Sequence, residues 1–180
     1  MSKRVALLRA VNVGGTGTLP MARLRQIAAG AGFGMPQTLL QSGNVVFEGG
    51  SAGDADLEAR LAQALETEAG LSTDIFVRDA AGWARLMAAN PMPAEADAAP
   101  SAFLMLVLRA PAPPATLEKL HAFCADGERL EARGDALYAL FPGGMGRSRL
   151  AAAMGTKAAG LVGTGRNWNT VRKLAALLAG

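Results

Sequence analysis

The stretch QTLLQSGNVVFE, residues 37–48, predicts a β-hairpin, and the rest of the fold can be worked out from it. Two short apolar runs flank Ser42-Gly43, and a small polar residue followed by glycine between such runs is typical of a hairpin turn. A second stretch has the same form. ERLEARGDALYALF, residues 128–141, places Gly134-Asp135 between two runs of its own. The sequence therefore predicts one hairpin in each half of the chain.

The elements around the two hairpins follow one order. In the first half, periodicity and capping signals predict a strand at 4–11, a helix from Pro20, the hairpin, a helix at 54–69 capped by Asp54, a strand at 73–78 and a short helix at 80–90. In the second half they predict a strand at 102–109, a helix at 114–125, the hairpin, a short helix at 147–154, a weak strand at 160–165 and a last helix at 167–179.

Both halves thus read βαββαβ followed by a helix, which is the split βαβ, ferredoxin-like order. We therefore expect an α+β fold built from two similar βαββαβ subdomains that arose by internal structural duplication. Residues 1–92 and 100–180 are the expected subdomains, and the proline- and alanine-rich residues 93–99 are the expected linker. Sequence identity between the halves is slight, so the expectation rests on element order.

Composition places the chain among ordinary globular proteins. Of its 180 residues, 51% are hydrophobic and 18% are charged, which allows a buried core. The densest apolar run, FLMLVL at 103–108, is far shorter than the roughly 18 residues of a membrane-spanning helix. Cys124 is the single cysteine, which excludes internal disulfides and multi-cysteine metal clusters. We expect a cytoplasmic protein that is not embedded in a membrane.

Charge is segregated along the chain although the net charge is only +3. All 15 acidic residues lie between Glu48 and Asp135, so residues 1–47 and 143–180 carry basic residues alone. If the two ends meet in the fold, they form a basic surface that favours a polyanionic partner. Arginines scattered over a solvated face are the alternative interpretation.

Three glycine-rich segments, at 12–20, 142–150 and 163–169, are each predicted to precede a helix. Glycine allows a ligand to approach the backbone closely, and free N–H groups at a helix start favour anions. None of the three matches a dinucleotide-binding or P-loop motif, and glycines before helices are usually only turns. The apolar stripe of the last helix indicates that Trp168 belongs to the core, and Asn167 or Asn169 is expected as its N-cap.

Four ordered motifs give the chain a family resemblance. The segments ALLRAVNVGG, QSGNVVF, GRSRL and RNWNTVRKL resemble those of the uncharacterised bacterial family called domain of unknown function 1697, over about residues 4–178. The resemblance implies a compact fold of two α+β subdomains and no established activity. Ala10 stands where members often have glycine, and Arg149 stands where lysine is usual.

The charge pattern and the family motifs fall on the same segments, and together they give a set of candidate anion-binding residues. We expect the following to form one face or cleft: Arg9, Asn12, Gly14, Gly15, Asn44, Arg147, Ser148, Arg149, Arg166, Asn169, Arg172 and Lys173. The predicted partner is a nucleic acid or a phosphorylated, nucleotide-like small molecule.

Enzyme chemistry has little support in the sequence, and whether the chain is an enzyme stays open. His121 is the single histidine and is interpreted as a surface residue, while Cys124 is interpreted as a small buried hydrophobe. No catalytic residue, metal site or cofactor is predicted. An enzyme acting on an anionic metabolite and a structural or regulatory homo-oligomer are the alternatives to a binding module, and the sequence does not give the oligomeric state.

Overall fold

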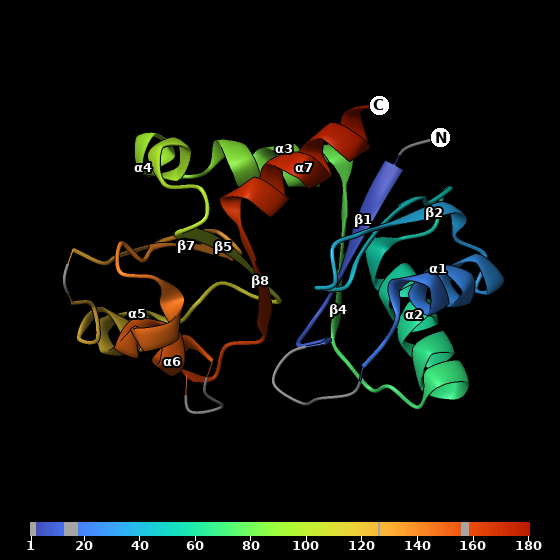
Figure 1. The fold of residues 1–180 in the computed structure, drawn as a ribbon, viewed down its shortest axis with the longest axis horizontal. Coiled ribbons are helices and arrows are strands. Elements are labelled where there is room, and N and C mark those ends of the chain that lie inside the picture. The colour runs from blue at the N-terminus through green and yellow to red at the C-terminus, as the bar shows by residue number, and fades with distance from the viewer. Residues whose placement is uncertain (1–2, 13–17, 126, 156–158) are drawn as a thin grey trace. The chain divides into compact units, whose positions relative to one another are not determined.

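Two four-stranded antiparallel sheets organise the chain, each with its own flanking helices (Figure 1). The structure is a computed structural model that describes residues 3–12, 18–125, 127–155 and 159–180. Residues 1–85 together with 173–180 form one compact unit, and residues 86–172 form a second one. We refer to them as the first and the second unit.

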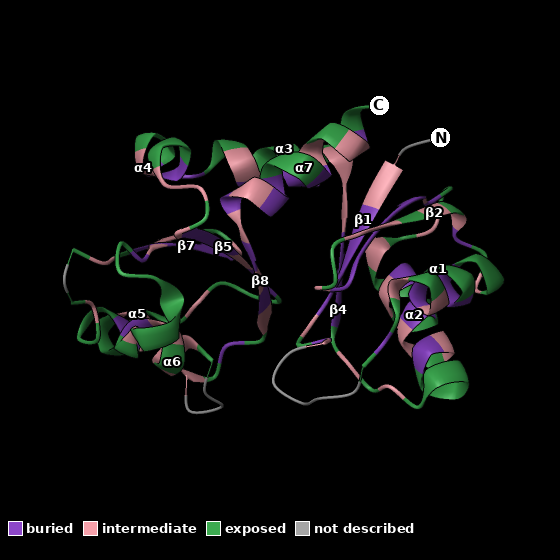
Figure 2. Ribbon diagram, in the orientation of Figure 1, coloured by how far each residue is buried: buried purple, intermediate pink, exposed green. Residues whose placement is uncertain are grey.

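The first unit contains β1 (Lys3–Leu8), α1 (Met21–Gly30), β2 (Gly34–Leu39), β3 (Asn44–Glu48), α2 (Asp54–Ala69) and β4 (Ile75–Asp79), followed by α3 (Ala80–Ala88). Its sheet has the order β2-β3-β1-β4. Side chains alternate between the faces of a strand, so one face supplies Ala6 and Phe47 to a core that also holds Ile27 of α1 and Leu61 of α2. In Figure 2 the inner surfaces of α1 and α2 are buried and their outer surfaces are exposed. The helical spacing of Leu57, Leu61 and Leu65 explains why α2 packs along this face.

The second unit repeats this plan. It contains α4 (Pro93–Ala98), β5 (Phe103–Leu108), α5 (Pro114–His121), β6 (Arg129–Arg133), β7 (Ala136–Leu140), the 3-10 turn η1 (Met145–Arg147), α6 (Arg149–Met154) and β8 (Gly163–Asn167). The last helix, α7 (Trp168–Ala179), begins in the second unit and ends in residues assigned to the first. The sheet of the second unit has the order β6-β7-β5-β8. Leu104, Leu120 and Leu150 belong to one core cluster, which lies between this sheet and α5 and α6.

Equivalent hydrogen bonds confirm the predicted duplication. The N–H of Leu8 donates to the carbonyl of Gly43 at 2.8 Å, and the N–H of Leu108 donates to the carbonyl of Asp135 at 2.8 Å. Each bond lies where the first strand of a unit meets the end of its hairpin turn. The two sheets also have the same strand order, in which β5, β6, β7 and β8 take the places of β1, β2, β3 and β4. The α+β fold of two βαββαβ units, inferred from element order, is therefore correct.

The duplication extends to the helix that follows each fourth strand. The carboxylate of Asp79 accepts the N–H of Gly82 at 2.6 Å, and the side-chain oxygen of Asn167 accepts the N–H of Thr170 at 3.0 Å. Each acceptor is the last residue of its strand and caps α3 or α7. Of the two asparagines considered for this role, Asn167 is the cap.

The two tryptophans are buried, one in each unit. Trp83 in α3 is 1% exposed. Trp168 is 6% exposed and meets the Phe103 ring edge-on with 5.6 Å between centroids. The expectation that Trp168 belongs to the core is confirmed.

Several local expectations need correction. The segment expected as a linker contains α4, in which Ala96 is buried. Asp54 is not the N-cap of α2, because Gly53 holds that position and the Asp54 carboxylate instead forms an ion pair with Arg4. Helix α5 ends at His121, four residues earlier than expected. The subdomain limits at 92 and 100 stay a prediction, which limited proteolysis checks.

Candidate anion-binding residues

The third glycine-rich segment precedes helix α7 as expected, but its glycines lie in strand β8 rather than in an open loop. Gly163 and Gly165 lie in β8, paired with β5. A Cβ on Gly163 would lie 2.7 Å from Leu108 Cδ2, and one on Gly165 would lie 2.9 Å from Leu104 Cδ1. These glycines make room for leucine side chains of the neighbouring strand. They leave no space at those positions for a phosphate.

Arg166 is consequently a buried strand residue. It is 7% exposed, and its Nη1 donates to Thr164 Oγ1 at 2.8 Å and to the Gly165 carbonyl at 2.7 Å. Burial lowers the pKa of Arg166 to about 10, so the guanidinium remains charged at neutral pH. Arg166 pairs with Met105, whereas the alternate residue Leu104 faces the core under α5 and α6. Arg166 therefore lies on the opposite sheet face from α6, and it does not share a surface with Arg149.

Two candidate asparagines hold loops together. Asn12 donates from Nδ2 to the carbonyls of Leu19 at 3.0 Å and Gln41 at 2.9 Å, and its Oδ1 accepts the Leu19 N–H at 2.7 Å. Asn44 is fully buried and donates to the Leu39 carbonyl at 2.7 Å. Both amides are engaged in closing turns. Gly14 and Gly15, predicted beside Asn12, lie outside the described residues.

Arg9 and Arg172 each face a carboxylate. Arg9 pairs with Asp74 at 3.0 Å. Arg172 lies 3.6 Å from an Asp97 oxygen and donates to Asn169 Oδ1 at 3.3 Å. Both are partly exposed pairs, which contribute little stability but reduce the charge offered to a ligand. Lys173 is exposed.

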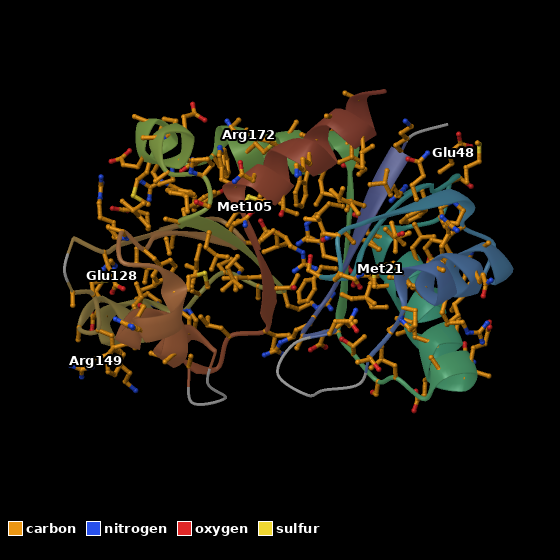
Figure 3. The ribbon with its side chains drawn as sticks, viewed as in Figure 1. Met21, Glu48, Met105, Glu128, Arg149 and Arg172 are labelled. Atoms are coloured by element: carbon orange, nitrogen blue, oxygen red, sulfur yellow. The ribbon has the colours of Figure 1, made fainter. Side chains whose placement is uncertain are left out.

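Arg147 and Arg149 differ from the other candidate arginines. Both are exposed, and neither has a carboxylate oxygen within 4.0 Å among the residues that the structure describes. The Arg149 guanidinium carbon lies 5.5 Å from the centroid of the Phe123 ring, which is a cation–π contact. Figure 3 shows Arg149 projecting from the ribbon of the second unit. Ser148, between them, is the N-cap of α6 and accepts the Ala151 N–H at 3.0 Å.

The predicted single surface draws on residues of both units. Arg9, Asn12, Asn44 and Lys173 belong to the first unit, and Arg147, Ser148, Arg149, Arg166, Asn169 and Arg172 belong to the second. A surface shared between the two chain ends stays a prediction. Within the second unit, Arg147 and Arg149 are the candidates available to a ligand.

The Cys124 thiol is poorly suited to nucleophilic chemistry. Burial raises the pKa of the Cys124 thiol, and the nearby Glu128 carboxylate raises it further, which disfavours the nucleophilic thiolate. Across residues 3–12, 18–125, 127–155 and 159–180, no three His, Cys, Asp or Glu side chains are grouped as metal ligands. In those same ranges no helix combines the length and apolarity required to cross a bilayer.

The model of the family described as "Protein of unknown function (DUF1697)" matches residues 1–138. This chain belongs to that family. Among solved structures, the DUF1697 chain is similar to the conserved bacterial protein SP0830 from Streptococcus pneumoniae, with a TM-score of 0.74 and 16% sequence identity. The alignment covers 100% of this chain and 99% of that one. At this identity the likeness shows the fold alone. A comparison with curated proteins found no match.

Proposed function

We propose that this protein is a binding module for a phosphate-bearing partner, and that residues 142–149 of the second unit are its central contact. The proposal rests on the exposure of Arg147 and Arg149 and on the lack of a carboxylate partner for either among the described residues. By contrast, Arg9 and Arg172 are paired and Arg166 is buried.

The contact with Phe123 prepares Arg149 for this role. A guanidinium that stacks on an aromatic face keeps its in-plane N–H groups free, and those groups match two oxygens of a phosphate. The ring also restricts the side chain, so less conformational freedom is lost on binding. Phe123 is 36% exposed, which leaves the stacked pair accessible to a ligand.

The backbone of this segment is open to close approach. A Cβ placed on Gly143, Gly144 or Gly146 would meet nothing within 4 Å. Glycines with open space beside them let a ligand backbone come near the chain, in contrast to the packed glycines of β8.

A nucleic acid is the partner class that this geometry supports first. The two arginines lie at the end of η1 and at the start of α6, both exposed, and such a surface suits a repeating phosphate backbone. A phosphorylated small molecule and an enzyme acting on an anionic metabolite remain the competing interpretations. The salt dependence of binding distinguishes them, since backbone contacts release counterions and a small ligand releases few.

The test is a fluorescence-anisotropy titration with single-stranded and duplex DNA, RNA and ATP over a range of salt concentrations. Arg147→Ala and Arg149→Ala should each weaken binding by about 1.5–3 kcal/mol, the usual range for charge-assisted hydrogen bonds. For DNA or RNA, the double variant should also flatten the log–log salt slope by roughly 1.5–2.

The matched control is Arg60→Ala with Arg85→Ala, which removes the same charge from exposed positions of α2 and α3. An equal loss in the control would mean that only net charge matters, and the proposed site would be wrong. Arg9→Ala with Lys173→Ala tests the wider surface. A loss of binding in that variant supports participation of both chain ends.

A further inference from the structure

Each sheet has two edge strands, and their outward-facing backbone groups can be identified. The edges are β2 and β4 in the first unit and β6 and β8 in the second. In an antiparallel ladder, alternate residues bond to the neighbour and the residues between them point outward. The outward-facing backbone groups of the four edge strands can therefore be compared.

Loop hydrogen bonds fix this alternation in both sheets. Arg9 N–H donates to the Asp74 carbonyl at 3.0 Å, so Val77, at odd spacing from Asp74, points away from β1. The N–H of Arg109 donates to the Val162 carbonyl at 2.8 Å, so by the same alternation the N–H and carbonyl of Gly165 point away from β5. The hairpin bonds of Leu8 and Leu108 likewise turn Thr38 of β2 and Ala132 of β6 outward.

On three of the four edges, the arginine that directly follows an outward residue covers the carbonyl of that residue. Arg78 Nη1 donates to the Val77 carbonyl at 2.8 Å. Arg133 Nη1 donates to the Ala132 carbonyl at 2.7 Å, and Arg166 Nη1 donates to the Gly165 carbonyl at 2.7 Å. The Val77 N–H also donates to Glu58 Oε1 at 2.7 Å. Charged side chains on edges are a known means of preventing strand addition.

The β2 edge lacks this cover. The residue equivalent to Arg133 is Leu39, since each lies opposite the first residue of the returning strand. Within the described ranges, no side chain is bonded to the outward N–H or carbonyl of Thr38. Met35 is 74% exposed and Leu40 is 49% exposed at this edge.

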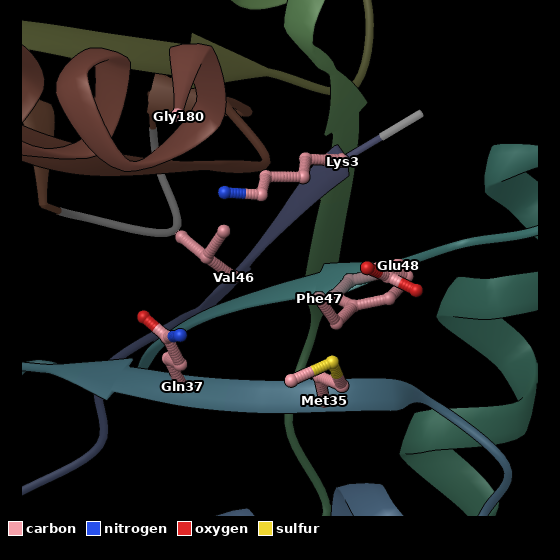
Figure 4. Close-up of a pocket in the computed structure, with 7 residues that line it drawn as sticks. All are labelled: Lys3, Met35, Gln37, Val46, Phe47, Glu48 and Gly180. Carbon is pink, nitrogen blue, oxygen red and sulfur yellow. The ribbon is translucent and has the colours of Figure 1, made fainter. Parts of the chain in front are cut away.

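A hollow borders β2 on each side of the sheet. One, of about 240 Å³, is lined by Met35, Gln37 and Val46 with Lys3 and Glu48 (Figure 4). In Figure 4 the Gln37 side chain points from β2 toward Val46, and Met35 lies on the same strand below Phe47. The other, of about 400 Å³, lies against α1, and Arg25 is part of its lining. An added strand sends alternate side chains to the two faces, where these hollows would receive them.

We propose that β2 is a docking edge for an extended segment of a partner protein, which adds to the first sheet as a fifth strand. The residues beside the β2 edge indicate which side chains the partner segment should carry. Arg25 is exposed and has no carboxylate within 4.0 Å among the described residues. The partner segment should therefore place acidic side chains on the face of the sheet that α1 covers. On the other face, Met35, Val46 and Phe47 provide apolar contacts for the side chains of the segment, with Lys3, Gln37 and Glu48 beside them.

A second copy of this chain is a poorer occupant than a peptide. Self-pairing about Thr38 would bring Pro36 of each copy into the new ladder, and proline has no N–H to donate. A peptide loses only one bond to this proline, whereas a symmetric dimer loses two.

The probe is a fluorescein-labelled peptide, Ser-Val-Glu-Val-Glu-Val-Ser, titrated against the full chain by anisotropy. It should bind more tightly than the same peptide with Lys in place of Glu. Two N-methylated versions, at the odd and at the even amides, test main-chain pairing, because only one row of amides faces the edge. One version should lose binding and the other should keep it. Failure of the parent peptide to bind, or equal behaviour of the two methylated versions, overturns the proposal.

Variants of the chain test the edge itself. Thr38→Pro removes an outward N–H without deleting a hydrogen bond of the β2–β3 ladder and should weaken binding about tenfold, while Thr38→Val should bind as the parent does. Leu39→Arg transfers the arginine found on the other edges and should also weaken binding, with Leu39→Met as its control. Unchanged binding in Thr38→Pro contradicts the proposal, with circular dichroism confirming that each variant is folded. Concentration-dependent dimerisation that Thr38→Pro abolishes would assign the edge to a second copy instead.

Discussion

The segment between the third and fourth strands differs most between the two units. In the first unit it is α2, sixteen residues long, with Leu57, Leu61 and Leu65 buried. In the second unit it is an exposed glycine-rich turn, η1 and the six-residue α6, in which Leu150 is the buried residue. The sheets and the caps that follow them have kept one plan. The fold thus tolerates wide change in this connection, and the arginines of the proposed site lie in the shorter version.

The largest effect should come from the leucines that anchor these two connections. Leu61→Ala and Leu150→Ala each open a cavity, and a buried leucine truncated to alanine usually costs about 2–5 kcal/mol. Leu61→Ala should lie at the upper end, because the long helix α2 cannot collapse into the space. Leu150→Ala should lie at the lower end, because α6 is short and can shift. Chemical denaturation of both variants measures the difference, and a larger loss for Leu150→Ala would contradict the comparison.

A smaller effect is expected at Tyr138, whose counterpart in the first unit is Val46. The hydroxyl of Tyr138 is buried and donates to the Leu86 carbonyl at 2.6 Å. Tyr138→Phe leaves that carbonyl without this donor and should cost about 1–2 kcal/mol. Denaturation at neutral pH measures the loss.

The same variant has a pH signature. Burial, reinforced by Asp135 and opposed by Arg133, raises the pKa of Tyr138 to about 12. The unfolded chain loses this proton near pH 10, so the stabilising contribution of Tyr138 is full below about pH 10 and is lost as pH rises toward 12. The gap in unfolding free energy between parent and Tyr138→Phe should therefore narrow above pH 10. A constant gap would show that the hydroxyl does not titrate in this way.

The smallest effects should come from the equivalent caps. Asp79→Ala and Asn167→Ala each remove one N-cap acceptor and should each cost about 1 kcal/mol. Asp79→Asn is the matched control, since it keeps an acceptor oxygen and removes only the charge. Thermal unfolding of the three variants compares the caps directly. Costs that differ by more than a factor of two or three would mean that the caps are alike in geometry only.

The strands and their order along the chain could be predicted from the sequence because strand and hairpin signals are local. Gly134-Asp135 and Ser42-Gly43 mark turns wherever they stand, and alternation assigns the neighbouring strands. The candidate site could be predicted only in part. An asparagine that binds a ligand and one that closes a turn, as Asn12 and Asn44 do, are identical in sequence.

The β8 segment shows the same limit for glycine. Gly163 and Gly165 resemble a ligand-binding loop in sequence, but leucine side chains of β5 occupy the space beside them. That space depends on strand pairing about sixty residues away along the chain, which local patterns do not contain. The arginine covers on the edges are likewise visible only once the outward carbonyls are known.

The burial of Trp83 in the first unit and Trp168 in the second gives the chain one natural optical probe for each unit. Replacing either indole by phenylalanine leaves a protein whose emission reports on a single unit. Two such spectra, followed through the same denaturation, would show whether the two halves melt together or one after the other, with no label attached.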